Sequence, residues 1–457
     1  MKQLQVFLIM AISILELLKN FSGIDLSMVI FMLGTLFLLI ALHSVSSGFR
    51  RPVTVFLVLG ISLLIYAQAD ITVWKKAVSS MLNIVGILVT MQLFCIPIAA
   101  GQYGQAVECI MRRSADSPQR LFGIISLLTN IFGSFLLFGT IPVMLSLVKD
   151  GVFKFVNMPE RFISNAITRS YALVVLWTPT AVNIVIVCSI TGATWQELAV
   201  PGLSIGLIGL LLSNILEYRQ IDTYRRITVS DSIQVSDEDF ALAKRKLVHI
   251  LAVVLGLISL VVYFGYLNIG SNTAQVMLAG LIIAAIWIAA NRNSSLLRRY
   301  WQSYLDVEVL KMLDLSVMFI AISIFSQGME AAGVLEMLVP LLGFIYTQVG
   351  VGIAAVLSVL IIALAYIGVH PFGAMVIIGN IIMSMDLGIS PVIISLAILL
   401  GASIAYILSP FAGMVLTMSK FMNVAPLTVS LKWNGWYSLV YFSAAIAFIY
   451  AYGYWFL

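Results

Sequence analysis

The chain has 457 residues, of which 61% are hydrophobic and only 10% are charged, with a formal net charge of +5. Soluble domains average about 45–50% apolar and about 25% charged residues, so a soluble enzyme, a disordered chain and a fibrous protein are excluded. The apolar runs are continuous over roughly 18 to 25 residues, the length of a membrane-spanning helix, and they lack the alternation of barrel strands. We therefore expect an all-α polytopic membrane protein.

Taken in chain order, the apolar runs that charged residues bound predict about eleven transmembrane helices. They cover approximately residues 4–18, 26–47, 52–69, 78–100, 169–192, 195–216, 247–266, 273–290, 313–328, 389–419 and 434–456. Two further apolar stretches, about 120–148 and 349–385, are interrupted by glycine, proline and polar residues. We expect each to be a re-entrant hairpin, because irregular backbone at membrane depth is tolerated only where protein surrounds it.

The basic residues predict the orientation of these helices. If the N-terminus is cytoplasmic and both hairpins are re-entrant, all but three of the 25 lysines and arginines face the cytoplasm. The three exceptions are Lys19, Lys75 and Lys76. Because cytoplasmic loops carry the excess of Lys and Arg, we expect an integral protein of a prokaryotic cytoplasmic membrane with its N-terminus inside and its C-terminus outside.

Two fragments in the middle of apolar spans share the pattern hydroxyl-Pro-x-Ala, namely Thr178–Ala181 and Ser409–Ala412. A Gly-x-x-Pro pattern lies upstream of each. Pro142 precedes Pro179 by 37 residues, and Pro371 precedes Pro410 by 39 residues. After the first helix is set aside, each half thus contains a hairpin and five spans, one of them the broken helix, and this odd number makes the two copies opposite in orientation. The pattern predicts two inverted-topology repeats, which are typical of secondary transporters.

The repeats divide the chain into four parts. Residues 1–25 hold the first transmembrane helix, 26–216 the first repeat, 217–246 a cytoplasmic linker and 247–457 the second repeat. The broken helices are expected at about 169–192 and 389–419. Within the linker, Ser236 followed by Asp239 predicts the capped start of the next helix.

The proline breaks are the candidate binding site. A proline inside a helix removes a backbone donor and frees carbonyls; half-helix N-termini then suit an anion and the freed carbonyls a cation. The alternatives are a simple kink at each proline and helix–helix packing by the polar side chains. The candidate residues are Asn130, Gly133, Ser134, Thr140, Pro142, Thr178, Pro179, Thr180, Asn183, Gly368, His370, Pro371, Ser409, Pro410, Gly413 and Thr417.

Two ionisable residues beside the breaks each have two interpretations. His370, next to Pro371, either carries a coupling proton or caps loose carbonyls as a neutral ring. Arg169, at the predicted start of the first broken helix, either anchors that helix at the membrane interface or attracts anions.

The segment Ser316–Glu336, SVMFIAISIFSQGMEAAGVLE, ends in a Met-Glu-x-x-Gly stretch before the second hairpin. With the order of hairpins and broken helices, it resembles the ion transporter superfamily, which includes divalent anion:sodium symporters, citrate transporters and arsenite efflux pumps. The resemblance implies a homodimer with an elevator-like movement of the hairpin-bearing core. Dicarboxylate symporters of this superfamily carry Ser-Asn-Thr at both hairpin tips. Residues 130–134 are only partly similar and residues 366–371 do not match, so the subfamily stays open.

We therefore expect a secondary active transporter, not an enzyme, that moves a small anionic solute such as an organic carboxylate together with Na⁺ or H⁺. The expected partners are this solute, the coupling ion, membrane lipids and a second copy of the chain, without nucleic acid. A lipid-linked precursor or lipid flippase is the alternative. A multi-span glycan polymerase or ligase is favoured less, because the predicted outside loops are short and nearly free of basic residues.

No catalytic residue, metal site or cofactor is predicted, apart from a coupling Na⁺. The three cysteines have no CxxC spacing, and the three histidines are scattered along the chain, so they form no ligand cluster.

The predicted orientation can be tested with reporters. A reporter fused after Leu457 is expected to be accessible from outside the cell, and one inserted near Gln234 only from inside, because of the uneven distribution of Lys and Arg. Labelling by a membrane-impermeant reagent measures this. A C-terminus inside the cell would contradict the odd number of spans on which the inverted arrangement depends.

Overall fold

The computed structural model describes residues 2–19, 25–113, 117–136, 140–220, 224, 236–290, 294–385 and 388–456. Every element of regular secondary structure in this part of the chain is a helix. Nine helical segments among these residues are long and apolar enough to cross a membrane. The predicted all-α polytopic architecture is therefore supported, with nine such segments where the sequence suggests about eleven. Gly139, Gln234 and Leu457 lie outside the described residues.

Two expected spans, 4–18 and 169–192, are not among the nine. The first corresponds to α1 (Lys2–Lys19), which carries three charged side chains within its 18 residues. The second is divided by its proline break into helices of 16 and 10 residues, and neither is long enough to cross a bilayer alone.

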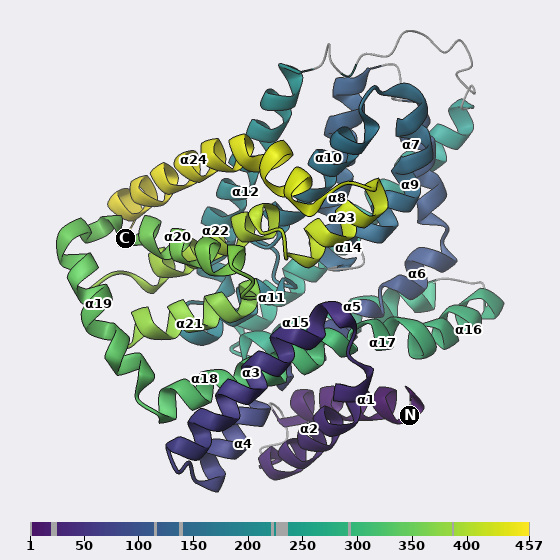
Figure 1. The fold of residues 1–457 in the computed structure, drawn as a ribbon. Coiled ribbons are helices and arrows are strands. Elements are labelled where there is room, and N and C mark those ends of the chain that lie inside the picture. The colour runs from purple at the N-terminus through teal and green to yellow at the C-terminus, as the bar shows by residue number, and fades with distance from the viewer. Residues whose placement is uncertain are drawn as a thin grey trace.

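The N-terminal helices form one end of the molecule, and α7 to α10 lie at the opposite end (Figure 1). The elements of the N-terminal part are α1, α2 (Ser27–Ala41), a 3₁₀ turn (Leu42–Ser44), α3 (Ser47–Tyr66) and α4 (Ile71–Ser79). They are followed by α5 (Leu82–Gln92), α6 (Cys95–Ala100) and α7 (Tyr103–Arg113), which lead the chain toward the other end.

The first predicted hairpin consists of two helices that pack on each other, α8 (Pro118–Leu136) and α9 (Thr140–Phe155). The first broken helix follows as α10 (Pro159–Val174) and α11 (Val182–Thr191), separated by irregular backbone, and α12 (Trp195–Tyr218) packs on α10. Helix α10 begins before the predicted boundary at residue 169, because Pro159 at the first helical position is well suited to start a helix.

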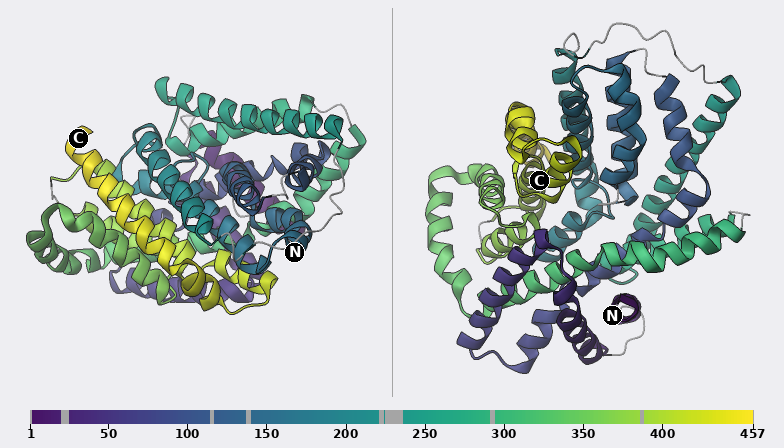
Figure 2. Two further views of the ribbon diagram at one scale, coloured as in Figure 1. Left: turned by 90° about the horizontal axis from the view of Figure 1, so that it is seen from above. Right: turned by 45° about the vertical axis from the view of Figure 1, so that its right-hand side comes forward.

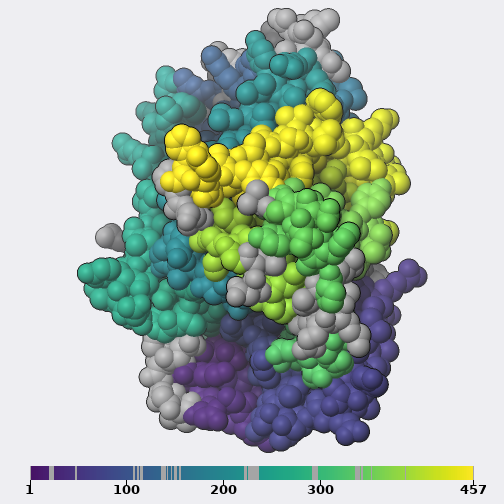
Figure 3. All heavy atoms as spheres, turned by 90° about the vertical axis from the view of Figure 1, so that its left-hand side faces the viewer, coloured from purple at the N-terminus to yellow at the C-terminus, as the bar shows by residue number. Residues whose placement is uncertain are grey.

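The second half follows a similar order, and its C-terminal helix, yellow in Figure 2, lies alongside α12. This half begins with α14 (Asp237–Tyr266), α15 (Asn272–Ala290), α16 (Ser294–Ser303), a π-helical segment (Tyr304–Glu308), α17 (Val309–Lys311), α18 (Leu313–Ala331) and α19 (Val334–Val349). After a 3₁₀ turn (Gly350–Gly352) come the hairpin helices α20 (Ile353–Tyr366) and α21 (Pro371–Met383), the broken helix α22 (Pro391–Leu408) and α23 (Gly413–Met422), a second π-helical segment (Thr428–Lys432) and α24 (Trp433–Phe456). The C-terminal residues lie across one face of the molecule, beside the green residues of the second hairpin (Figure 3).

Two features of the second half bear on the sequence analysis. The predicted cap of α14 is confirmed, because the Ser236 Oγ accepts a hydrogen bond from the Asp239 amide at 3.1 Å.

Helix α19 is missed by the sequence analysis. It has only 16 residues and contains Pro340, so its apolar run was not recognised as a separate helix. It precedes the second hairpin as α7 precedes the first.

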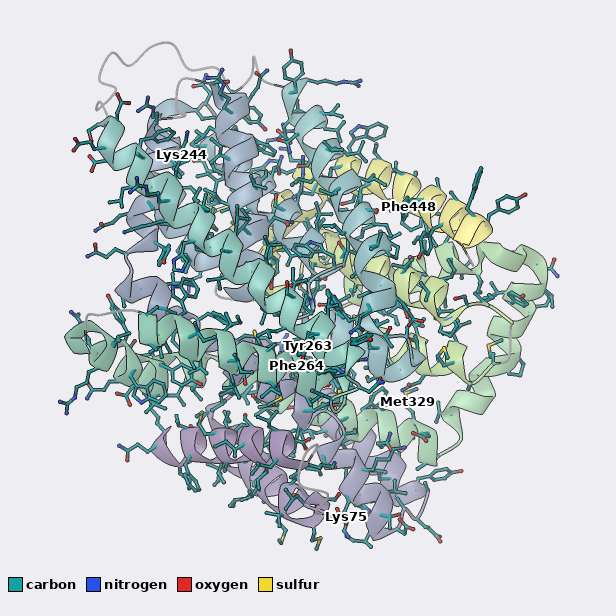
Figure 4. All side chains as sticks on the ribbon, turned by 180° about the vertical axis from the view of Figure 1, so that it is seen from behind. Lys75, Lys244, Tyr263, Phe264, Met329 and Phe448 are labelled. Atoms are coloured by element: carbon teal, nitrogen blue, oxygen red, sulfur yellow. The ribbon has the colours of Figure 1, made fainter. Side chains whose placement is uncertain are left out.

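Figure 4 places Lys75 on α4 and Lys244 on α14 at opposite ends of the molecule. The sequence analysis assigns these two lysines to opposite sides of the membrane. The orientation of the chain in a membrane stays a prediction.

Helices α3 and α18 pack so closely that their backbones touch. A Cβ atom on Gly60 would lie 2.6 Å from the backbone nitrogen of Phe325, and one on Gly328 would lie 2.7 Å from the carbonyl oxygen of Gly60. In a membrane, where lipid removes the hydrophobic drive between helices, small residues give the close van der Waals contact that holds two helices together.

Replacing Gly60 by alanine is expected to lower the stability of the folded protein, because the added methyl group meets backbone that has no room to move. Overpacking of this kind typically costs about 1–3 kcal/mol. Thermal unfolding in detergent measures the effect. Gly435→Ala on α24 is the control, since a Cβ there meets nothing within 4 Å. Equal melting temperatures for Gly60→Ala and the wild type would contradict the contact.

Candidate functional site

The two proline breaks have the same local geometry. In the first, the Thr178 Oγ1 donates to the carbonyl oxygen of Ser134 at 3.1 Å, and in the second the Ser409 Oγ donates to the carbonyl oxygen of Ala365 at 2.6 Å. Each acceptor lies near the end of the first helix of its hairpin, and each bond joins residues 44 positions apart. A hydroxyl just before the proline therefore ties each break to the tip of the preceding hairpin.

The half-helices that follow the breaks also match. Helices α11 and α23 are both ten residues long, and both begin after an alanine in extended conformation, Ala181 and Ala412. Both end at a residue in the left-handed conformation, Gly192 in the first and Asn423 in the second.

The two broken helices cross each other at equivalent positions. The Ser403 Oγ on α22 donates to the carbonyl oxygen of Ala172 on α10 at 2.7 Å, and these residues are 231 positions apart. Thr178 and Ser409 have the same separation, as do Ser134 and Ala365. Equivalent residues that touch each other are what a two-fold axis through the crossing point produces.

A pocket lies beside the first break. Its nine lining residues come from α8, the break, α10, α11 and α21, and they are Gly133, Tyr171, Val174, Val175, Thr178, Ala181, Val182, Asn183 and Phe372. The free space between these side chains is small, and part of it is open to the outside. The N-terminal residues of α11 are among the lining, so the positive end of that helix dipole faces the pocket. Its first amides have no partner within the helix.

Asn183 is held in this pocket by residues of the second half. Its Oδ1 accepts a hydrogen bond from the Tyr406 hydroxyl at 3.4 Å, and its Nδ2 lies 3.3 Å from the sulfur of Met375. The side chain is 2% exposed. The first half-helix and the second hairpin therefore meet at one polar residue.

Several of the predicted residues gather here. Gly133, Thr178 and Asn183 line the pocket. Thr180 is not among the lining residues, but it bonds to the same hairpin, since its Oγ1 donates to the carbonyl oxygen of Ser134 at 2.5 Å. Asn130 donates to the carbonyl oxygen of Ser170 at 3.2 Å and so ties the hairpin to α10.

Other predicted residues lie elsewhere. Pro179 lines a second cavity on the side of α14 and α15, with Trp195 and Gln275. Ser409 is buried at the second break with Pro410 beside it, and nothing lies within 4 Å of a Cβ added to Gly413. The Thr417 Oγ1 bonds to the Gly413 carbonyl oxygen in its own helix. The structure therefore brings together the residues of the first break more closely than those of the second.

The remaining predicted residues lie at the hairpin tips. Thr140 is buried in the first turn of α9. Pro142 belongs to the same turn, but its side chain lies outside the described part of the structure. Gly368 has φ +102°, a conformation in which L side chains are strained, and Pro371 is the first residue of α21.

His370 is the N-cap of α21, where its Nδ1 accepts a hydrogen bond from the Phe372 amide at 3.3 Å. Its ring also lies beside the rings of Phe49 and Phe372. His370 therefore caps a backbone amide in this structure, whereas the sequence analysis expects it to cap carbonyls, and an Nδ1 that accepts a hydrogen bond carries no proton in that state.

Arg169 does not line the pocket. Its side chain is 3% exposed and pairs with Glu217. Because α10 begins ten residues before Arg169, this residue lies inside the helix and not at its predicted start.

The sequence analysis missed the aromatic residues of the site. Tyr171 and Phe372 line the pocket, and Tyr406 holds Asn183. Each lies in an apolar run, where an aromatic side chain gives no signal that separates a binding role from core packing. Only their proximity to the breaks in the folded chain identifies them.

No protein-family model matches the chain, and no curated protein matches it. Among solved structures, the fold is similar to the crystal structure of the YdaH transporter from Alcanivorax borkumensis, which is described as having an unusual topology. The two share 13% sequence identity with a TM-score of 0.60, over 88% of this chain and 98% of the transporter. At this identity the likeness establishes the fold alone.

The double hydrogen bond on the Ser134 carbonyl predicts a non-additive effect. In Thr178→Val or Thr180→Val alone, that carbonyl keeps the other hydroxyl as its partner. Each single variant should therefore lose about 1 kcal/mol or less of its free energy of unfolding. The double variant leaves a buried carbonyl oxygen without either donor and should lose about 1–3 kcal/mol more than the sum. Thermal unfolding compares them, with Thr417→Val as control. Strictly additive losses would show that the two hydroxyls do not share one acceptor.

Proposed function

We propose that the protein is a secondary active transporter that moves a small anionic solute, such as an organic carboxylate, across the membrane by an elevator-type movement of the two hairpins and broken helices. The observation that carries this proposal is the pair of matched bonds from Thr178 to Ser134 and from Ser409 to Ala365. They give both halves the same broken-helix unit, which is the arrangement that secondary transporters use around a substrate site.

The proposed repeats are residues 26–216 and 247–457. The constant separation of 231 residues between matched positions, and the crossing of Ala172 and Ser403, support a common plan for the two halves. Opposite orientation of the two copies would let the site open alternately to each side, since each copy can adopt the conformation of the other. The transporter with a similar fold adds support at the level of architecture.

The chemistry of the pocket supports an anionic solute. The N-terminal turn of α11 has amides without an acceptor inside the helix, at the positive end of the helix dipole, and such a site can bind a carboxylate without a basic side chain. None of the nine lining residues is Lys or Arg. A flippase for phosphate-bearing lipids would be expected to use such cations, so this lining does not favour that alternative. The walls from Tyr171, Val174 and Phe372 suit an apolar part of the solute.

The remaining parts of the proposal rest on the resemblance to the ion transporter superfamily. We propose that transport is coupled to Na⁺ or H⁺, that the protein acts as a homodimer in a prokaryotic cytoplasmic membrane, and that its N-terminus is inside. Backbone carbonyl oxygens beside Thr178 and Ser409 are the groups proposed to bind a coupling Na⁺.

The proposed site predicts that Asn183→Leu abolishes transport while the protein stays folded. Leucine keeps the branching of asparagine at Cγ and is somewhat larger, but it cannot bond the Tyr406 hydroxyl or a polar group of the solute. Counterflow of radiolabelled mono-, di- and tricarboxylates into proteoliposomes measures transport, and size-exclusion chromatography in detergent checks the fold.

Thr417→Val is the matched control, because this hydroxyl bonds only within its own helix among the described contacts. We expect wild-type counterflow for this variant. Wild-type counterflow by folded Asn183→Leu would contradict the site. No counterflow with any carboxylate by the wild-type protein would contradict the solute class.

A further inference from the structure

The residues that line the pocket beside the first break are all buried. A carboxylate that enters this pocket leaves most of its water behind. The loss of water costs free energy unless hydrogen-bond donors and positive charge replace it. The number of positions that offer such a replacement therefore limits the number of carboxylates that the solute can carry.

One such position is the N-terminus of α11. This helix begins after Ala181, without a side chain that caps its first amides, and a helix N-terminus carries about half a positive charge. The Nδ2 of Asn183 carries two hydrogens. Among the described contacts, its partner is the sulfur of Met375 at 3.3 Å, which is a weak acceptor. Asn183 lines the pocket and is 2% exposed, so a buried donor lies at the positive end of the helix.

A second helix begins beside the pocket, but its N-terminus is already occupied. Helix α21 starts at Pro371, which has no amide hydrogen. The amide of Phe372, the next residue, donates to His370 Nδ1 at 3.3 Å. Neither of the first two residues of α21 therefore offers a free amide to a solute.

The second break does not supply a further position for an anion. At the separation of 231 residues that relates the two breaks, Met414 takes the place of Asn183 and Phe411 takes the place of Thr180. Phe411 is 60% exposed, and none of the nine lining residues belongs to α23. The second half thus has apolar side chains where the first half has an amide and a hydroxyl.

Charged side chains do not supply a second position either. None of the nine lining residues is charged. Arg169 lies two residues before Tyr171 on α10, but its Nη1 is 2.9 Å from Glu217 Oε1, and both side chains are buried. These two opposite charges offset each other, so they add little net potential at the pocket.

Apolar and aromatic side chains form most of the remaining wall. The ring of Phe372 is fixed there, because its centre lies 5.1 Å from that of Phe319 on α18 and 6.1 Å from that of Tyr406 on α22. Phe372 is fully buried. A ring held between two others limits the length of a solute in this small space. The other members of this wall are Tyr171, Val174, Val175 and Val182.

We propose that the solute is a monocarboxylate with a short apolar body, whose carboxylate binds at the start of α11 and whose body lies against Phe372. This inference rests on the proposed function and narrows its solute class. A second carboxylate at the far end of the solute would lie against the ring and the valines, where no donor or positive charge replaces its water. Di- and tricarboxylates are therefore excluded.

Three solutes with five-carbon chains separate charge from size. Valerate has one carboxylate and an apolar end, glutarate has a carboxylate at each end, and valeramide has no charge. Thermal unfolding of the purified protein in detergent at neutral pH measures binding, and counterflow into proteoliposomes measures transport. We expect valerate to bind and to exchange, and glutarate and valeramide to bind at least about tenfold more weakly.

Asn183→Asp tests where the carboxylate binds. The variant keeps the shape of the side chain and places a negative charge beside the expected carboxylate. An acidic residue in the first turn favours a helix, so we expect the variant to fold. It should bind valerate at least about tenfold more weakly than the wild type. Asn268→Asp is the matched control, because Asn268 is exposed after the end of α14, and it should bind valerate like the wild type.

Phe372→Ala tests where the apolar body lies. The wild type should bind octanoate at least about tenfold more weakly than valerate, because the ring leaves no room for three more methylene groups. The folded variant should lose this preference. Phe344→Ala on α19 is the control, since this side chain is 65% exposed, and it should keep the preference.

The outcomes separate this inference from the proposed function. Glutarate that binds or exchanges as well as valerate would overturn the inference and leave a carboxylate transporter. The same holds if a dicarboxylate exchanges and valerate does not. Valerate that binds without counterflow of any carboxylate would contradict the proposed function and support the inference. A wild-type protein that binds none of the solutes would overturn the inference.

The variants decide the orientation of the solute. Wild-type binding of valerate by folded Asn183→Asp would overturn the inference, as would a wild-type preference for valerate in folded Phe372→Ala. If either variant fails to fold, the wild-type comparisons decide. Equal binding of valerate and glutarate, or of valerate and octanoate, would then overturn the inference.

Discussion

Inside a bilayer, a backbone carbonyl near the end of a helix has to find its partner within the protein, because lipid offers none. Two short hydroxyl side chains at the breaks supply such partners to the ends of the hairpin helices, through the bonds of Thr178 to Ser134 and of Ser409 to Ala365. These bonds also fix each hairpin tip against the break that follows it. The pocket depends on this arrangement, since it forms where the tip residue Gly133 meets the start of α11.

The parts of the fold that the sequence predicts well are those fixed by local chemistry. A proline removes a backbone donor from a helix, and the matched hydroxyl-Pro-x-Ala fragments at Pro179 and Pro410 predict the positions of both breaks. The cap at Ser236 is predicted for the same reason, because the three residues after it suffice to form the bond. The overall helical architecture follows from composition alone.

The parts that the sequence does not predict depend on side-chain contacts between segments that are far apart in the chain. Nothing near Asn183 in the chain indicates that Tyr406 bonds to it, because the two residues are 223 positions apart. The burial of Arg169 likewise depends on Glu217 and Asn434, which arrive from other helices. An apolar run containing Tyr171 or Phe372 looks the same whether that ring lines a pocket or fills a core.

The contact between Gly60 and Phe325 has a consequence for the synthesis of the chain. Helix α3 enters the membrane long before α18 exists, and at about 5–20 residues per second the ribosome needs tens of seconds to make the segment between them. During this time the glycine face of α3 has only lipid or a chaperone beside it. Assembly of the N-terminal end therefore waits for the second half, and a chain truncated before Leu313 leaves that face uncovered for the quality-control proteases to recognise.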